Sequence, residues 1–123
     1  SENYTVLGNL SVVHVNLIYN FVYVWLYPSS YEGFGIPVVE AMKAGLPVIA
    51  YNSSSIPEVL GDSGIMLNSL ESNDIVSSIK SLDNDEFKNK IIKSGFRQSS
   101  LFSWDNTIEQ YQLIFKKLYE SHI

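Results

Sequence analysis

Three short apolar runs, each followed by a segment with helical periodicity, constrain the fold of this chain most. They cover residues 21–27, 47–51 and 65–67. The first run is continuously apolar until Pro28, which is typical of a strand buried on both faces, and we predict it as the central strand of a sheet. Strands that alternate with helices through short connections form parallel sheets. The sequence therefore predicts an α/β fold.

Local signals place further elements before the second run. Residues 4–8 are β-prone and end in a Gly-Asn turn signal, which predicts a strand leading into a helix. Ser11 is placed to cap that helix, which we expect over residues 11–20. Pro37 and Gly45 mark the two ends of another helix, because proline favours the first helical turn and glycine the position after the last.

The remainder of the chain is predicted to be helical apart from the third run. A small helix is expected over residues 57–60, and two amphipathic segments follow it. Gly95 is expected to interrupt the helical pattern before the last segment. Ser103 is placed to cap a last helix with an apolar face formed by Trp104, Ile108, Tyr111, Phe115 and Leu118.

Charge and composition exclude several classes of function. Eight basic against thirteen acidic residues give a net charge of −5, so we expect no nucleic-acid partner. No apolar run approaches the roughly 20 residues that a membrane-spanning helix needs. The chain has no cysteine, which excludes disulfides and thiolate metal sites and fits a reducing cytoplasm. The start at Ser1, without an initiator methionine or a leader pattern, suggests a fragment of a longer protein.

The loop after the first run carries the candidate chemistry. In open parallel sheets, ligands bind beyond the carboxyl ends of the strands. Gly33 and Gly35 flank Phe34, so we expect the backbone there to adopt unusual dihedral angles and to approach a ligand closely. Glu32 precedes these glycines, and the two acceptor oxygens of a carboxylate match two neighbouring hydroxyls of a sugar. The loop is therefore predicted to bind a polyhydroxylated ligand.

The helix that follows this loop offers a place for an anion. With Pro37 at the first helical position, Ile36 is predicted to be the cap residue, and isoleucine has no oxygen to satisfy the first amides. The amides of Val38 and Val39 are then expected to be free. A phosphate there would gain hydrogen bonds and the positive end of the helix dipole without any lysine.

These residues form a string that resembles a known signature. Glu32 and Glu40, with seven residues between them, resemble the E-x(7)-E motif of GT-B retaining glycosyltransferases of family 4, the group 1 type. Further matches in register lie at residues 7–8, 27–29, 45–50, 56–59, 61–62 and 102–104. The resemblance thus covers nearly the whole chain and implies a Rossmann-like parallel sheet flanked by helices, as part of the C-terminal half of a GT-B fold.

The resemblance also implies a division of the chain. Residues 1–102 would form part of the nucleotide-sugar donor-binding domain. Residues 103–123 would form a C-terminal amphipathic helix that packs on this domain or crosses to an N-terminal domain absent from the sequence. Because the basic residues that neutralise the diphosphate normally lie in the absent part, the chain alone is not expected to turn over. Its location would be cytoplasmic, with peripheral membrane attachment through the N-terminal domain as a further expectation.

Site roles follow from the resemblance residue by residue. Glu32 would lie under the donor sugar as the catalytic residue, and Glu40 would bind the ribose. The backbone groups expected to contact the sugar and the diphosphate are those of Gly33, Phe34, Gly35, Ile36 and Val38. Leu10 corresponds to a position whose backbone faces the base. The implied donor is a UDP- or GDP-linked sugar, and the family requires no cofactor and no obligatory metal. Both a same-face ion pair and a covalent intermediate fit these residues.

Other interpretations remain beside this one. A truncated or degenerate donor domain could act as a nucleotide-binding or interaction module, and it could self-associate through apolar residues such as Val12, Val13, Phe21 and Trp25. A GT-B epimerase or phosphorylase shares the fold without this string. A nicotinamide site is rejected, because valine stands at position 38 where the third glycine of that fingerprint belongs. His14 and His122 are interpreted as a helix-face residue and a terminal residue.

Overall fold

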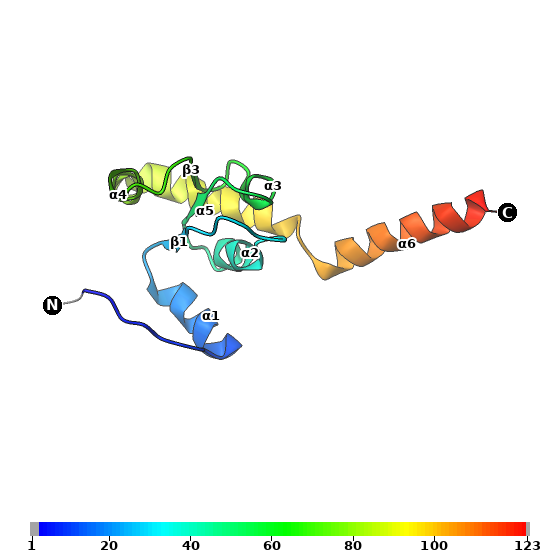
Figure 1. Cartoon of the computed structure of the whole chain (residues 1–123), viewed down its shortest axis with the longest axis horizontal. Coiled ribbons are helices and arrows are strands. Elements are labelled where there is room, and N and C mark those ends of the chain that lie inside the picture. Colours follow the sequence, from blue (N-terminus) through cyan, green and yellow to red (C-terminus); the bar gives the residue numbers. More distant parts are fainter. Residues whose placement is uncertain (1–2, 123) are drawn as a thin grey trace.

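The computed structural model describes residues 3–122 (Figure 1) and contains a three-stranded parallel sheet in the order β1-β2-β3. The strands are β1 (Trp25–Tyr27), β2 (Val48–Tyr51) and β3 (Ile65–Leu67). Helix α2 (Ile36–Lys43) connects the first two, and helix α3 (Ile56–Leu60) connects the last two. This alternation confirms the predicted α/β fold with a parallel sheet flanked by helices.

Alternating side chains of the sheet pack against two helical layers. Val48 and Ala50 of β2 belong to a core shared with α2 and α3. Ile49, between them, belongs to a second core with Leu82, just after helix α4 (Ser72–Ser81), and with Ile91. Because successive side chains of a strand point to opposite faces, β2 is covered on both sides. It is the central strand, and Val48, Ile49 and Ala50 are all buried.

The prediction that residues 21–27 form the central strand is wrong. Strand β1 is three residues long, lies at the edge of the sheet and is only half-buried. The start of the run belongs instead to helix α1 (Val12–Phe21), whose last residue, Phe21, is 85% exposed. The Ser11 cap is confirmed, since its hydroxyl accepts a hydrogen bond from the His14 amide. A continuous apolar run therefore contained a helix end as well as a strand.

Residues 4–8 were predicted to form a strand, and this prediction is also wrong. The described part of the N-terminal segment has no regular structure before α1, and its side chains are exposed. Figure 1 shows this segment (dark blue) running apart from the sheet. A β-prone segment is stable as a strand only when a neighbouring strand satisfies its backbone groups, and no strand within residues 3–122 pairs with this segment.

Helix α5 (Asp85–Ser100) passes through Gly95, so the predicted interruption at this glycine is wrong. Gly95 is buried where α5 packs against α2, and a Cβ atom there would lie 3.5 Å from the Cβ of Met42. The glycine thus permits close helix packing and does not end the helix. Its cost in helix propensity, about 1 kcal/mol relative to alanine, is offset by this packing.

Helix α6 (Trp104–Ser121) is capped by the Ser103 hydroxyl, as predicted, and extends away from the other elements (Figure 1). Its residues are exposed along its whole length, including its apolar side chains. What covers this apolar face stays a prediction. Among residues 3–122, no helix is both long and apolar enough to cross a membrane.

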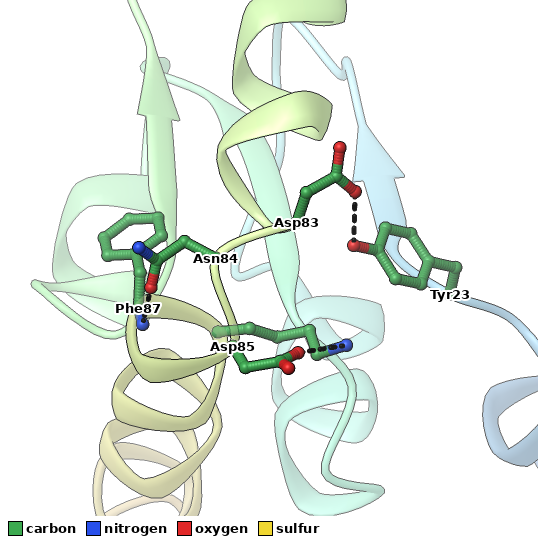
Figure 2. A network of polar contacts seen from close by, with 6 residues as sticks. Tyr23, Asp83, Asn84, Asp85 and Phe87 are labelled. Atoms are coloured by element: carbon green, nitrogen blue, oxygen red, sulfur yellow. Dashed lines mark hydrogen bonds and ion pairs between the residues drawn. The ribbon is translucent and has the colours of Figure 1, made fainter.

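A small polar corner joins the start of β1 to the junction between α4 and α5 (Figure 2). The Tyr23 hydroxyl donates to Asp83 Oδ1 at 3.2 Å. The Asn84 side chain caps α5 by accepting from the Phe87 amide at 2.9 Å. Lys88 lies 5.0 Å above the Tyr23 ring and 3.8 Å from Asp85. This corner lies at the end of β1 opposite to the loop that carries Glu32.

Candidate functional site

The candidate site lies where the chain leaves β1 and enters α2. Pro28 to Gly35 form a loop without regular structure, and Gly35 is the N-cap of α2 in a left-handed conformation with φ of 96°. A Cβ atom at Gly35 would lie 2.9 Å from Ile56 Cδ1. The left-handed dihedral angle favours glycine at this position, and any other residue would also make the flexible Ile56 side chain shift. The unusual dihedral angle expected of the glycine pair is thus present at Gly35, whereas Gly33 has no positive φ and is open to solvent.

The Glu32 carboxylate is held by two hydroxyls from its own segment. Tyr27 donates to Glu32 Oε1 at 2.6 Å, and Ser29 donates to the same oxygen at 2.8 Å. These two hydrogen bonds, first that of Tyr27 and then that of Ser29, lower the pKa of the Glu32 carboxyl. Burial and the same bond to Glu32 raise the pKa of Tyr27 to about 12. At neutral pH the pair is therefore a neutral phenol and a charged carboxylate.

Three consecutive serines between β2 and α3 hold the backbone of this loop. The Ser53 hydroxyl donates to the Ser29 carbonyl at 2.8 Å, and the Ser54 hydroxyl accepts from the Glu32 amide at 2.8 Å. The Ser55 hydroxyl donates to the carbonyls of Glu32 at 3.3 Å and Phe34 at 2.9 Å. The loop after β1 is thus fixed from the loop after the neighbouring strand.

Glu40 lies on α2 and is exposed, with its carboxylate held by helix α1. The hydroxyl of Tyr19 donates to Glu40 Oε2 at 3.2 Å. Tyr19 is buried, and its ring packs edge to face on Trp25 with 5.0 Å between centroids. Burial, followed by the charge of Glu40, raises the pKa of Tyr19 to about 12. A tyrosine hydroxyl therefore orients each of these two glutamates.

The other predicted site residues differ in their surroundings. Phe34 is 44% exposed and packs edge to face on Phe102, with 5.4 Å between ring centroids. Ile36 is 55% exposed at the first position of α2. Leu10 lies just before α1, and no hydrogen bond within residues 3–122 joins it to the loop. The binding roles of these residues stay predictions.

The helix start is arranged differently from the prediction. The cap residue is Gly35, not Ile36, because glycine can adopt the left-handed conformation that turns the chain into the helix. The Val38 amide donates to the Gly35 carbonyl at 3.0 Å, so the prediction that this amide is free is wrong. Since Pro37 has no amide hydrogen, the first turn offers the amide of Ile36 and the positive end of the helix dipole.

The sequence interpretation missed the side chains that hold the two glutamates. Tyr27 is the last residue of β1, and Tyr19 lies in α1. Their hydroxyls reach Glu32 and Glu40 only in the folded chain. The sequence interpretation assigned no role to the serines at positions 53–55. Their contacts with the Glu32 loop, from more than 20 residues away, were not visible.

Two shallow hollows in the described part of the chain lie away from the loop. One is lined by residues of α6, including Glu109 and Lys116, and the other by residues of α5, including Lys90 and Arg97. Glu32 and Glu40 line neither of them. Residues 3–122 contain no group of three His, Asp or Glu side chains placed to hold a metal ion.

Comparisons with known proteins place this geometry in a family. The family model described as glycosyl transferases group 1 matches residues 1–98. The chain is 38% identical over 113 residues to O-antigen chain mannosyltransferase B of Escherichia coli. It is 36% identical over 91 residues to the serotype-specific mannosyltransferase WbdA of the same species. These alignments cover 88% and 73% of this chain but only 30% and 11% of the two relatives.

A solved structure shows the same fold. Sucrose-phosphate synthase from Thermosynechococcus elongatus matches 95% of this chain, and 30% of its own chain, with a TM-score of 0.82 at 24% identity. The sheet and helices described above are thus part of the C-terminal half of a GT-B fold. Because the family model matches most of the chain, the chain belongs to the glycosyl transferases group 1 family.

Proposed function

We propose that this chain forms the donor-binding part of a retaining glycosyltransferase that transfers mannose from a nucleoside diphosphate sugar. The observation that carries the proposal is the pair Glu32 and Glu40, which flank the turn into α2 and are each oriented by a tyrosine hydroxyl. The mannosyl group is suggested by the relatives, two of which are named as mannosyltransferases. The nucleotide is UDP or GDP.

Glu40 is proposed to bind the ribose. Its side chain is exposed on α2, and the Tyr19 hydroxyl engages only Oε2 at 3.2 Å. The carboxylate therefore keeps acceptor sites for two neighbouring ribose hydroxyls. Hydrogen bonds to a charged acceptor contribute about 1.5–3 kcal/mol each, which is enough for this contact to determine nucleotide affinity.

Glu32 is proposed to contact the transferred sugar. Both hydroxyl donors from the protein reach Oε1, which leaves Oε2 for a sugar hydroxyl. Their effect on its pKa keeps the carboxylate charged over the whole neutral range. A fixed negative charge close to the anomeric carbon would favour the positive charge that develops there as the diphosphate leaves.

The diphosphate is proposed to lie at the start of α2. The backbone of residues 33–36 approaches this point, and α2 has no side-chain cap that would occupy it. The positive end of the helix dipole would stabilise the negative charge that grows on the leaving group. Departure and attack on the same face would then give retention. A product with inverted configuration at the anomeric carbon, detected by proton NMR, would contradict this part of the proposal.

Titration calorimetry with GDP and UDP on the intact protein tests nucleotide binding. Glu40→Ala is expected to weaken the preferred nucleotide about tenfold or more, because two charge-assisted hydrogen bonds are lost. The matched control is Glu71→Ala, which removes an exposed carboxylate at the start of α4 that makes no capping hydrogen bond. Unchanged affinity in Glu40→Ala, or an equal loss in Glu71→Ala, would overturn the ribose assignment.

A second candidate function is an interaction module without its own activity. It is favoured by the apolar side chains exposed on α1, such as Val12 at 75% and Phe21 at 85%, and by the exposed face of α6. Large exposed apolar patches usually mark contact surfaces. Light scattering at increasing concentration of this chain tests the idea. A monomer throughout, together with nucleotide binding, would reject self-association and favour the enzyme.

A further inference from the structure

We propose that Ser54 is a positioning residue that holds Glu32 in the orientation needed to meet the donor sugar. This inference rests on the proposed function of Glu32. It concerns a residue of the neighbouring loop, between β2 and α3, to which the sequence interpretation assigned no role. The proposal starts from the backbone conformation of this residue.

The backbone of Ser54 has a left-handed conformation, which is unfavourable for a residue other than glycine. Its φ is 42°, and it is the one non-glycine residue with positive φ among residues 3–122. An L-residue in this conformation is less stable than glycine, because its Cβ approaches the backbone. Glycine would remove this strain. The hydrogen bond that the Ser54 hydroxyl accepts offsets part of this strain.

The Ser54 hydroxyl forms a hydrogen bond with Glu32, the residue proposed to contact the transferred sugar. It accepts a hydrogen bond from the Glu32 amide at 2.8 Å, across 22 positions of the sequence. The Ser55 hydroxyl donates to the Glu32 carbonyl at 3.3 Å. The peptide groups on both sides of the Glu32 Cα are thus fixed from the same loop. The side chain leaves the backbone in a direction that these two bonds determine.

The other end of the Glu32 side chain is fixed separately. Tyr27 and Ser29 hold Oε1, as described above. With its backbone and one carboxylate oxygen fixed, Glu32 has little freedom left, and Oε2 points in one direction before any ligand arrives. Preorganisation of this kind strengthens the contact that is made and changes contacts elsewhere little. Because Ser54 is exposed, its hydroxyl contributes to orientation more than to folding.

The test compares a nucleoside diphosphate with its sugar-linked form. Ser54→Gly removes the hydroxyl and relieves the strain at once. We expect its affinity for GDP-mannose, or the UDP sugar if UDP is preferred, to fall about three- to tenfold, the loss of one hydrogen bond. Affinity for the free nucleoside diphosphate should stay unchanged, because Glu40 contacts the ribose. The midpoint of thermal unfolding should stay equal or rise. A general loss of stability would lower the unfolding midpoint and weaken the binding of both ligands, so it could not cause a selective loss of affinity for the sugar donor.

Two further variants sharpen the result. Ser54→Asn tolerates the left-handed conformation and keeps a side-chain oxygen, so we expect it to bind the sugar donor better than Ser54→Gly. Ser63→Ala is the matched control: its buried hydroxyl donates to the Ser94 carbonyl at 3.0 Å, far along the chain from the loop. This control should lower the unfolding midpoint and leave both affinities unchanged.

The outcomes separate this inference from the proposed function. If the wild-type protein binds neither the nucleotide nor the nucleotide sugar, the proposed function fails. If the wild type binds both and Ser54→Gly retains its affinity for the sugar donor, the positioning role of Ser54 is overturned. An equal loss of nucleotide and sugar-donor affinity in Ser54→Gly would also overturn it, as would Ser54→Asn binding no better than Ser54→Gly.

Discussion

The same chemical pair, a tyrosine hydroxyl donating to a carboxylate, occurs at both ends of strand β1 with different surroundings. At the carboxyl end, Tyr27 donates to Glu32 at 2.6 Å, and Ser29 adds a second donor to the same oxygen. At the amino end, Tyr23 donates to Asp83 at 3.2 Å (Figure 2). The first pair is half-buried and the second is exposed.

The two hydrogen bonds connect different parts of the molecule. Tyr23 and Asp83 are 60 positions apart, so their bond joins distant parts of the chain. Tyr27 and Glu32 are five positions apart, so their bond shapes one loop and adds little to the connection between elements. Further hydrogen bonds from the serines of the neighbouring connection, and a glycine with left-handed dihedral angles, hold the loop that carries Glu32. Both donors to the Glu32 carboxylate reach Oε1, which supports the proposed contact between Oε2 and the donor sugar.

The strongest test of this contrast concerns the backbone of the loop. Gly35→Ala should lower the free energy of unfolding by about 1–2 kcal/mol, the cost of an L-residue with left-handed dihedral angles. The close approach to Ile56 Cδ1, 2.9 Å from a Cβ atom at this position, adds to that cost. Gly33→Ala is the matched control, because nothing lies within 4 Å of its Cβ position. Urea denaturation measures both. Equal losses in the two variants would contradict the special role of Gly35.

The next test removes one hydroxyl from each end of β1. Tyr27→Phe should raise the pKa of Glu32 toward its ordinary value, because the first of its two donors is lost. Affinity for the sugar donor should fall about three- to tenfold. Tyr23→Phe should change neither quantity. Carbon NMR of the Glu32 carboxyl group during an acid titration measures the pKa, and calorimetry measures the affinity.

The acid side of this titration also predicts a direction for stability. A carboxyl group whose pKa is lowered by folding contributes stability above the pKa of the unfolded chain and loses it as the pH falls through the folded value. Wild-type protein should lose this contribution in acid, and Tyr27→Phe should lose less. The same acid dependence in both proteins would show that the Tyr27 hydroxyl does not stabilise the charged form of Glu32.

Part of this contrast could be predicted from the sequence. The strand over residues 48–51 and the glycine-rich turn into α2 depend on local signals, namely an apolar run and the pair Pro37 and Gly45, and both were confirmed. The family string placed Glu32 and Glu40 beside this turn. Local chemistry was sufficient here because strand ends, helix starts and turns are determined by residues close together in the sequence.

The rest depended on contacts between distant residues. The run over residues 21–27 has one composition throughout, and whether Phe21 ends a helix or begins a strand depends on neighbours that composition does not reveal. Gly95 was predicted as a break because its packing against Met42, from another helix, is a tertiary contact. Likewise the serines that hold the Glu32 loop come from a different strand connection. These features follow from packing, which a linear pattern does not contain.

Alkaline pH should lower the free energy of unfolding through Tyr27, at the carboxyl end of β1, over a defined pH range. The pKa of Tyr27 is raised to about 12 by burial and by its bond to Glu32. A tyrosine with a raised pKa contributes stability that is complete below its unfolded value, about 10, and is lost as the pH rises toward 12. Tyr27→Phe should therefore lose less stability than wild type between these values. Urea denaturation across this range measures it, and identical losses would contradict the assignment.

The smallest effect is expected at the amino end. Lys88 lies 5.0 Å above the Tyr23 ring and 3.8 Å from Asp85, whose side chain is 87% exposed. Exposed ion pairs contribute at most about 1 kcal/mol, so Lys88→Met should lower the free energy of unfolding by several tenths of a kcal/mol and leave donor affinity unchanged.

Lys116→Met is the matched control for this last variant. It removes an ion pair with Glu120 at 4.0 Å on α6, formed by a more exposed lysine, and within residues 3–122 this lysine lies over no aromatic ring. The difference between the two losses isolates the contribution of the Tyr23 ring, which we expect to be about 0.5 kcal/mol, the lower end of the range for exposed sites. High salt should reduce both losses, because it screens exposed charges. A weaker sugar-donor affinity in Lys88→Met would mean that the amino end of β1 also supports the site, and the separation between the two ends would then not hold.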